Sequence, residues 1–442
     1  MRAPTDAADQ SQSFTTGISV RPQWKPRSRR MLALVTVLAV VLTPPFTALV
    51  YWRYVNAVPS YTPALPAAPL PNGYDYAARA LERLLGSRPL LPKEWRTAPE
   101  SALAPGIAAA SKPLSDVRRA FGIEWLAPSP LDRSANPSAD FSPVADYFAA
   151  ESRLRRLQGD PGGALRCSLD AMELGLRVVQ SGAERFNAQS HQNTGMEQAQ
   201  LCVDVAPRAG LAEQLARLRR IRLAWPRVAN TLEIDRQIAH ARLTKRLQEV
   251  SAQTLWQQLD EVEAQTVGAS SGTQFFGHGW STWRVVLTPR VHSLTVLDQR
   301  FIELKARASA PVRDGYGPPP LTDTLAERFA SGQMGGYRWE WPRQNLALLE
   351  AALAVRLYRL EHGHYPAQLR EIEPERLPEI PLDIWDQPVA YRLRNGRPVI
   401  YSLAGDGVDD GGKAANPYTF IEHGTGDAVW GKLCASDWPP KR

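Results

Sequence analysis

The chain has 442 residues, of which 44% are hydrophobic and 22% charged, a composition typical of a globular protein with two or three domains. Its net charge of +7 lies mainly near the start, where residues 1–30 carry six basic and two acidic side chains. The rest is close to neutral and has no basic stripe interleaved with aromatic residues, so we expect no nucleic-acid partner.

An uncharged apolar segment follows the basic tail. Residues 31–52 contain no charged side chain, and as a helix they would extend roughly 33 Å, enough to cross the hydrocarbon core of a bilayer. Three arginines lie within positions 27–30, directly before the segment. By the positive-inside rule the N-terminus is cytoplasmic and the chain after residue 53 lies outside. We therefore predict a single-pass inner (cytoplasmic) membrane protein with its body in the periplasm.

Two alternatives for this apolar segment remain open. The tripeptide Val-Asn-Ala at residues 55–57 could serve as a cleavage site, which would make the segment a removable signal peptide. A buried helix of a soluble protein is the second alternative. The length of the segment and the 30-residue polar tail before it favour a signal-anchor.

The middle third of the chain is predicted to be helical. Asp160 is a suitable N-cap and Pro161 a suitable first residue for a helix with one apolar face, formed by Leu165, Leu169, Met172, Leu176 and Val179. With the preceding segment this gives a helical hairpin similar to one tetratricopeptide unit, but no second copy recurs at a fixed period. Further helices are predicted over about 196–224, 229–266 and 282–308. The prolines between residues 87 and 143 predict only short helices there.

The last hundred residues change in character. A leucine-striped helix over 344–366 is followed by two short strand-like segments on either side of Asn395-Gly396, a pair that favours the type I′ turn of a β-hairpin. The expected fold is therefore mainly α, with a small C-terminal α+β domain made of a helix and a short antiparallel sheet. The predicted parts are a cytoplasmic basic tail (1–30), a transmembrane helix (31–52), a proline-rich spacer (53–72), an extracytoplasmic helical domain (73–308), a linker (309–343) and the α+β domain (344–442).

Residues 345–430 contain several motifs in a specific order: "LYRLEHGHYP" at the end of the helix, then "LPEIPLDIWDQPVAYRL", then "VIYSLAGDGVDDGG", and finally "TGDAVW". In this order they resemble the C-terminal soluble domain of the major pseudopilin of type II secretion systems. The whole layout is also similar to a group of single-span bacterial membrane proteins. The resemblance implies a pseudopilin-like α+β domain whose last loop carries a structural calcium ion.

The resemblance has two departures. Ile384 and Asp386 replace the Pro and Gly that flank the tryptophan in the family. The N-terminal segment also lacks the Gly-Phe cleavage site and the glutamate that begin a pseudopilin. The fold can therefore be shared without a role in pilus assembly.

The Asp/Gly loop at 401–412 is the strongest candidate site in the sequence. Hard cations prefer six to eight oxygen ligands, which carboxylates and backbone carbonyls of a tight loop can supply. The predicted Ca²⁺ ligands are Asp406, Asp409, Asp410, the backbone carbonyl of Leu403, and Asp427 from the closing segment. The loop is not an EF-hand, because the twelfth position from Asp406 is Pro417 rather than Glu. A solvated Asp/Gly turn without a metal is the alternative.

Other chemistry has weaker support. No nucleophile-elbow, zinc-protease, phosphate-loop or dinucleotide motif is present. His362 and His364 form a possible ligand pair, but the resemblance favours packing of the turn after the helix. Cys167 and Cys202 could form a disulfide, which would leave Cys434 unpaired. Alternatively, all three cysteines are unpaired, buried thiols. We predict no catalytic residue.

The sequence therefore favours a membrane-anchored extracytoplasmic interaction or scaffold protein with a calcium-braced C-terminal domain and an unidentified envelope partner. One alternative is an envelope hydrolase with a site between the helical body and the C-terminal domain, near His278 or His191. The other is an accessory of secretion or pilus assembly. The segment "GHGWS" at 277–281 is the nearest to an active-site loop, but a His and a Ser this close together in a glycine loop are common by chance.

Overall fold

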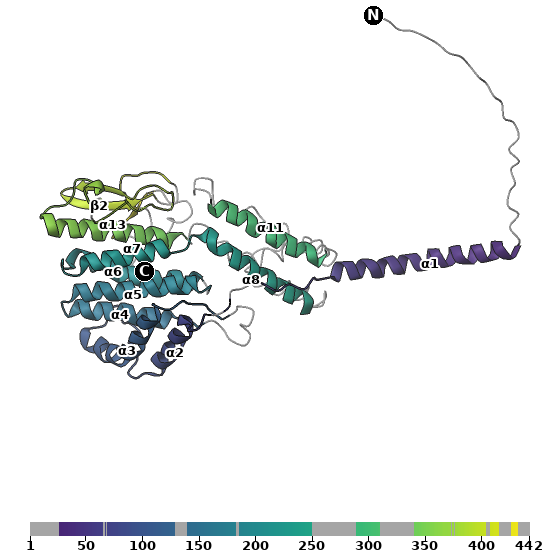
Figure 1. Ribbon diagram of the computed structural model, residues 1–442, viewed down its shortest axis with the longest axis horizontal. Coiled ribbons are helices and arrows are strands. Elements are labelled where there is room, and N and C mark those ends of the chain that lie inside the picture. The colour runs from purple at the N-terminus through teal and green to yellow at the C-terminus, as the bar shows by residue number, and fades with distance from the viewer. Residues whose placement is uncertain are drawn as a thin grey trace, which may run out of the picture. The chain divides into compact units, whose positions relative to one another are not determined.

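The protein is mainly helical, with ten α-helices and one three-stranded antiparallel sheet among the residues that the computed structural model describes (Figure 1). Those residues are 26–64, 67, 69–128, 139–182, 185–249, 289–309, 340–372, 374, 376–403, 407–414 and 426–431. The mainly α fold with a small C-terminal sheet, predicted from the sequence, is confirmed. The chain divides into two compact units, Met1–Ala57 and Val58–Arg442.

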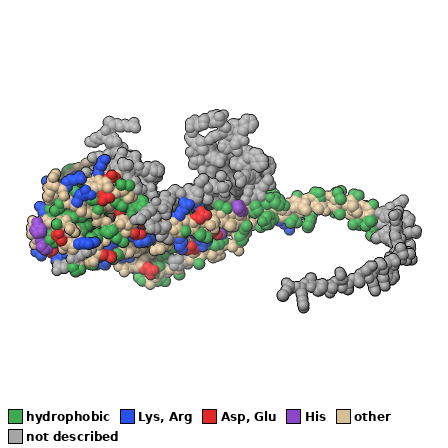
Figure 2. Space-filling model, turned by 90° about the horizontal axis from the view of Figure 1, so that it is seen from above, with side chains coloured by type: hydrophobic (Ala, Val, Ile, Leu, Met, Phe, Trp, Pro, Cys, Tyr) green, Lys and Arg blue, Asp and Glu red, His purple; other side chains and the backbone are tan. Residues whose placement is uncertain are grey.

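The first unit contains α1 (Pro26–Asn56). Its part Met31–Asn56 is long and apolar enough to cross a membrane, with a mean hydropathy of 2.2 in its most apolar window. The side chains of residues 31–54 in this helix are exposed and largely hydrophobic (Figure 2). By length and composition alone a signal sequence near the N-terminus would pass the same test.

The second unit begins with a stack of helices that follow one another in space nearly as they do in the chain (Figure 1). In the middle of the stack α5 contacts α4, α6 and α7, while α2 and α3 lie on the α4 side. The elements of this stack are α2 (Gly73–Gly86), α3 (Glu100–Ala120), α4 (Ser142–Leu157), α5 (Pro161–Gln180), α6 (Arg185–Gln200), the short 3₁₀ helix η2 (Val203–Val205) and α7 (Leu211–Ala224).

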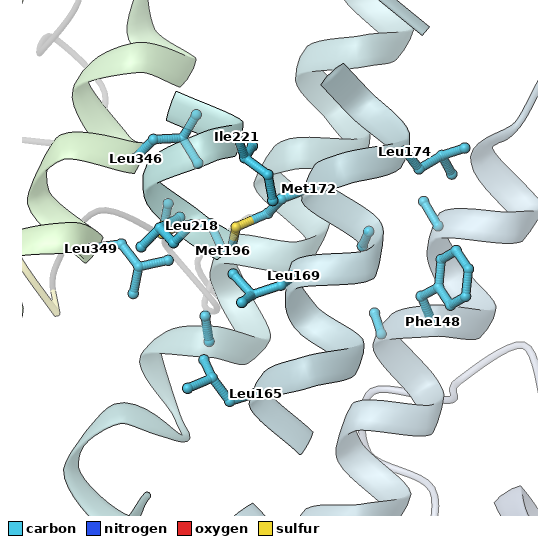
Figure 3. Packing of buried hydrophobic residues seen from close by; sticks show 14 of the residues in the cluster. Phe148, Leu165, Leu169, Met172, Leu174, Met196, Leu218, Ile221, Leu346 and Leu349 are labelled. Atoms are coloured by element: carbon cyan, nitrogen blue, oxygen red, sulfur yellow. The ribbon is translucent and has the colours of Figure 1, made fainter. Parts of the chain in front are cut away.

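Local signals explain where α5 begins and how closely it packs. The Asp160 side chain accepts a hydrogen bond of 2.8 Å from the Gly163 N–H, and Pro161 is the first helical residue, as predicted. Gly175 lets α6 approach, because a Cβ on it would lie 2.6 Å from the Ala188 carbonyl oxygen. The predicted apolar face of α5 is buried in the core, where Leu165, Leu169 and Met172 meet residues of α6 and α7 (Figure 3).

Two parts of the stack differ from the sequence-based expectation. The single helix predicted over about 196–224 is two helices, because Pro207 and the left-handed Gly210 (φ 76°) separate α6 from α7. Short helices were predicted between 87 and 143, but α3 runs for 21 residues with Pro105 and Pro113 inside it. Burial of its apolar face against α2 and α4 outweighs the hydrogen bonds that the two prolines remove.

The helices α8 (Val228–Glu249) and α11 (Arg290–Ser309) pair with each other and have a separate small core. The chain segment that opens the second unit is held against this pair. Val58 packs on its core, the Tyr61 ring lies 4.0 Å from the His240 ring, and Gln248 donates a 3.4 Å hydrogen bond to the Pro59 carbonyl.

The helix α13 (Trp341–His362) joins the stack to the C-terminal sheet. It contacts α7 and α6 as well as β2, and its residues belong to the same hydrophobic core as those helices. The remaining elements are the 3₁₀ helix η6 (Leu369–Ile372) and the strands β1 (Ala390–Arg394), β2 (Arg397–Ser402) and β3 (Ala428–Val429), in the order β1-β2-β3.

A buried carboxylate fixes this junction. Glu350 of α13 is fully buried, and its two oxygens accept hydrogen bonds from Arg219, at 2.7 Å, and from Arg222 of α7. Arg219 also donates a 3.0 Å bond to the Arg376 carbonyl, beyond η6. Arg219 of α7 therefore links Glu350 of α13 with the segment that leads to the sheet.

Replacing Glu350 with Ala should destabilise the protein by about 3–5 kcal/mol, because two guanidinium groups would lose their buried partner. Thermal unfolding of the detergent-purified full chain would measure the loss. Glu249→Ala is the matched control, since it removes an exposed pair with Lys245 at 3.8 Å and should cost about 1 kcal/mol or less. Equal losses for both variants would contradict a central role for Glu350.

Candidate functional site

The Asp/Gly loop leaves the sheet at the end of a β-hairpin. Strands β1 and β2 pair in antiparallel register from Ala390↔Tyr401 to Arg394↔Arg397. Asn395 and Gly396 both have positive φ, 50° and 72°, so the predicted type I′ hairpin is confirmed. The loop begins at Leu403, which is half-buried against Ile384 and Trp385.

Two glycines give the loop a fixed path. Gly407 has φ 67°, and a Cβ on it would lie 3.1 Å from the Trp385 ring, so the backbone runs directly over that ring. Gly412 has φ 74°, and a Cβ on it would lie 2.7 Å from Val399 of β2. The described part of the loop therefore packs closely on Trp385 at one point and on β2 at the other, and at both points the backbone angle favours glycine.

Asp427 anchors the end of the loop through hydrogen bonds of its side chain and its backbone. Its side chain is 1% exposed and accepts hydrogen bonds from the Gly412 N–H at 2.7 Å and from the Asp410 N–H at 3.4 Å. Its own N–H donates to the Lys413 carbonyl at 2.7 Å. Since β3 starts at the next residue, these bonds fasten the loop to the edge of the sheet.

The environment of Asp427 is unfavourable for a lone negative charge. Burial raises the pKa of its carboxyl, and the two backbone N–H bonds lower it only in part. The nearby negative charges of Asp409 and Asp410 raise the pKa further. Negative charge is therefore concentrated at the end of the loop, and carboxylate oxygens are the ligand type that hard cations prefer.

The five predicted metal ligands are only partly brought together. Asp410 and Asp427 are joined by the bond between the Asp410 N–H and the Asp427 carboxylate. Asp409 turns toward β1, where its carboxylate lies 3.6 Å from Arg392, and accepts a 2.8 Å bond from the Gly411 N–H. Asp406 lies outside the described residues. Within the described part of the chain, no three acidic, histidine or cysteine side chains converge as a metal site.

Sequence analysis missed Asp383, which supports the start of the loop. This residue is 3% exposed, and its carboxylate accepts bonds from the N–H groups of Trp385, at 2.8 Å, and Gln387, at 2.9 Å. Burial raises the pKa of Asp383, while hydrogen bonds, including those at Ser402 and Leu403, lower it. An Asp two residues before the tryptophan is a recognisable turn signal of the Asx type.

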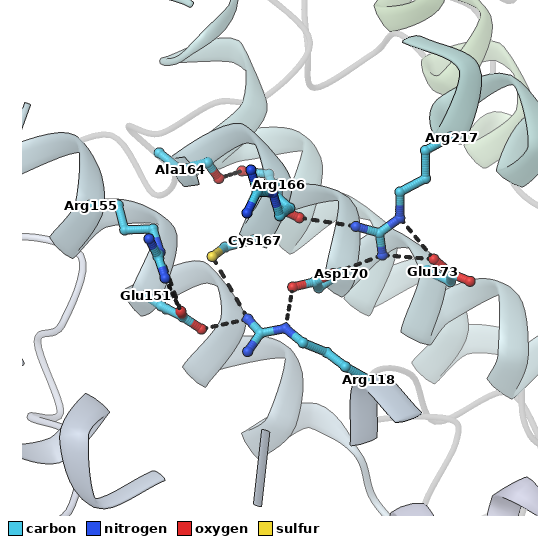
Figure 4. Close-up of polar contacts among 10 residues, drawn as sticks. Arg118, Glu151, Arg155, Ala164, Arg166, Cys167, Asp170, Glu173 and Arg217 are labelled. Carbon is cyan, nitrogen blue, oxygen red and sulfur yellow. Dashed lines mark hydrogen bonds and ion pairs between the residues drawn. The ribbon is translucent and has the colours of Figure 1, made fainter. Parts of the chain in front are cut away.

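The helical stack holds a second group of charged residues (Figure 4). Arg118 of α3 donates to Glu151 of α4 at 2.6 Å and to Asp170 of α5 at 2.7 Å. The other oxygen of Asp170 accepts a 2.7 Å bond from Arg217 of α7, which also binds Glu173. These ion pairs connect four helices of the stack.

Each carboxylate of this network forms an ion pair with the guanidinium group of an arginine. Burial favours a raised pKa at Glu151, but the adjacent Arg118 charge outweighs it and holds the pKa below its usual range. A group that stays ionised and paired is suited to holding helices together. The arrangement does not resemble a general acid, which needs a raised pKa.

His191, one of the two histidines of the enzyme alternative, is 1% exposed within α6. Burial lowers its pKa to about 4, against a small opposing effect of Asp140. Neither ring nitrogen has a hydrogen-bond partner among the described residues. The other histidine, His278, lies outside the described residues with the rest of 277–281.

Cys167 and Cys202 are buried and free in the structure, so no disulfide joins them. Burial raises the pKa of both thiols, that of Cys202 to about 11. Cys434 lies outside the described residues. Of the two possibilities given for the cysteines, Cys167 and Cys202 therefore match that of unpaired, buried thiols.

Comparison of the chain with protein-family models, with curated proteins and with solved structures gave no match.

Replacing Gly412 with Ala should destabilise the protein by about 1–3 kcal/mol, because the residue has a left-handed backbone and its new Cβ would clash with Val399. Thermal unfolding measures the effect. Gly86→Ala is the matched control: nothing lies within 4 Å of its Cβ position at the end of α2. That variant should be neutral or stabilising by up to about 1 kcal/mol. A neutral Gly412→Ala would mean that the loop is not fixed against β2.

Proposed function

We propose that this protein is a membrane-anchored extracytoplasmic interaction protein, with a calcium ion bracing the loop of its C-terminal sheet. The observation that carries the proposal is the layout of the second unit. Helices α2 to α7 stack side by side nearly in chain order, and α13 closes the stack with the sheet on its other side. Stacked helices of this kind offer long continuous surfaces, which helical-repeat proteins use to bind other proteins.

The buried charges support this proposal. Asp170 of α5 joins Arg118 of α3 and Arg217 of α7. Glu350 joins α13 to Arg219 of α7, which also binds the segment before the sheet. Their role is to hold neighbouring elements in place. The stack α2–α7, α13 and the sheet thus share one hydrophobic core, as a scaffold requires, while α8 and α11 have a small core of their own.

Membrane anchoring rests on α1 and on the basic tail. The apolar part of α1 is long enough to span a bilayer, and the arginines directly before it favour a cytoplasmic N-terminus. The chain after residue 30 is nearly neutral, so its charge does not indicate a different orientation of α1 in the membrane.

Calcium is proposed from the donor set of the loop. The Leu403 carbonyl and the carboxylates of Asp406, Asp409, Asp410 and Asp427 would hold the ion, and the Asp410 N–H is bonded to the Asp427 carboxylate. The ion would supply charge neutralisation around the buried Asp427 carboxylate, with a purely structural effect. The resemblance to the pseudopilin domain supports the same ion.

Calcium should raise the melting temperature of the full chain relative to a chelator. One site saturated at one hundred times its dissociation constant contributes about 2.7 kcal/mol of stability. Asp410→Asn should remove most of the shift, because the substitution deletes an exposed carboxylate of the loop. Glu379→Gln, an exposed acid outside the loop, should keep the whole shift. The absence of any calcium shift in the wild-type protein would refute the brace.

The interaction role can be tested by cross-linking in spheroplasts with a membrane-impermeant amine reagent. Exposed lysines such as Lys93 and Lys112 lie on the helical body. A defined adduct should form with the wild-type chain and disappear when residues 58–442 are deleted while α1 is kept. An adduct obtained only with a permeant reagent would contradict the location outside the cytoplasm. No adduct with either reagent would contradict the interaction role.

A further inference from the structure

We propose that His362 and His364 form a binding site for a divalent late transition-metal ion, with Cu²⁺ as the tightest-binding member of the class. The two residues lie at the end of α13, far along the chain from the aspartate loop. Their ring centroids are 6.3 Å apart, and both rings contact Tyr358, at 4.0 Å and 5.8 Å. Both side chains are exposed, and Figure 2 shows histidine side chains gathered at the surface.

The hydrogen bonds of the two rings fix which nitrogen is free. The Nδ1 atom of His362 lies 3.0 Å from the Tyr358 carbonyl oxygen, and Nδ1 of His364 lies 3.0 Å from the Tyr365 carbonyl oxygen. A carbonyl only accepts, so each Nδ1 must carry the hydrogen. In the neutral rings both Nε2 atoms therefore keep a lone pair, which is the tautomer that metal-binding histidines take when a carbonyl holds the other nitrogen.

The position at a helix end favours a cation. His362 is the last residue of α13, and Gly363 follows in the left-handed conformation, φ 81°, donating to the Arg359 carbonyl at 2.8 Å. The carboxyl end of a helix carries partial negative charge. The nearby Arg359 guanidinium is engaged by the Tyr365 ring and hydroxyl.

The spacing of the rings suits a shared ion. With metal–nitrogen distances of about 2.0–2.1 Å, two imidazoles on one ion have ring centroids roughly 5–6 Å apart. The observed separation of 6.3 Å is slightly larger, so the side chains would have to rotate for both Nε2 atoms to reach one ion. Imidazole nitrogen prefers copper, nickel and zinc to calcium, and copper binds most tightly in that series. This site is therefore independent of the proposed calcium loop.

The site would keep open coordination positions. Among the described residues no third histidine, cysteine or acid joins the pair, so water or a group from another molecule would complete the coordination. An exposed two-histidine site of this kind can bind a metal that a partner also binds. The pseudopilin resemblance implies that His364 helps to pack the turn after the helix, and its contact with Tyr358 allows both roles.

The test is a titration of Cu²⁺ into the full chain in detergent, purified without a histidine tag, with calorimetry and electron paramagnetic resonance as readouts. We expect one strong site with coupling to two imidazole nitrogens. His362→Asn and His364→Asn keep an N–H donor near the Nδ1 position and remove Nε2. Each variant should weaken Cu²⁺ binding at least tenfold and lose one nitrogen coupling.

His292→Asn, an exposed histidine of α11, is the matched control and should bind Cu²⁺ like the wild type. Excess Ca²⁺ should leave the copper affinity unchanged, which separates this site from the calcium loop. Wild-type binding no tighter than that of the double variant would overturn the proposal. A wild-type spectrum without two nitrogen couplings would overturn it as well, whatever the stability of the variants.

Discussion

The burial of Glu350 against two arginines is the constraint on which the rest of the second unit depends. A fully buried carboxylate is tolerable only when its charge is matched and its oxygens are hydrogen-bonded, and Arg219 and Arg222 meet both conditions. Because these partners come from α7, the position of α13 is set by the helical stack. The position of the sheet depends in turn on its contacts with α13.

This dependence gives the Asp/Gly loop a rigid base. The loop rests on Trp385 and β2, and Asp427 ties its end to the edge of the sheet. A cation held there would stabilise an arrangement that the backbone already defines. The histidine pair occupies a different part of the same helix-and-sheet region, where the chain leaves α13. The two proposed metal sites would therefore lie in different parts of this region and use different donors, carboxylates in one and imidazoles in the other.

Features set by neighbouring residues could be predicted from the sequence. Asp160 with Pro161 marks the start of α5, and Asn395-Gly396 marks the hairpin turn, since each works through a bond or backbone angle within a few residues. The continuation of α3 through Pro105 could not be predicted, because packing against distant helices decides it. The same holds for the partners of Glu350, which lie 128 and 131 positions away.

The candidate site was predictable in composition but only partly in geometry. The sequence shows the acids of the loop, and the pairing of Asp427 with the Asp410 backbone agrees with a shared site. The turn of Asp409 toward Arg392 depends on a strand partner that only the folded sheet provides. Asp383 was overlooked because its importance comes from burial, which spacing alone does not reveal.

The attachment of residues 58–61 to α8 has a mechanical consequence. Any tension that enters the second unit at Val58 first acts on the apolar contact of that residue and on the ring contact of Tyr61 with His240. Both contacts belong to the α8–α11 pair, which has its own small core. These contacts would have to break before a pull along the chain from Val58 could reach α2 and the main core.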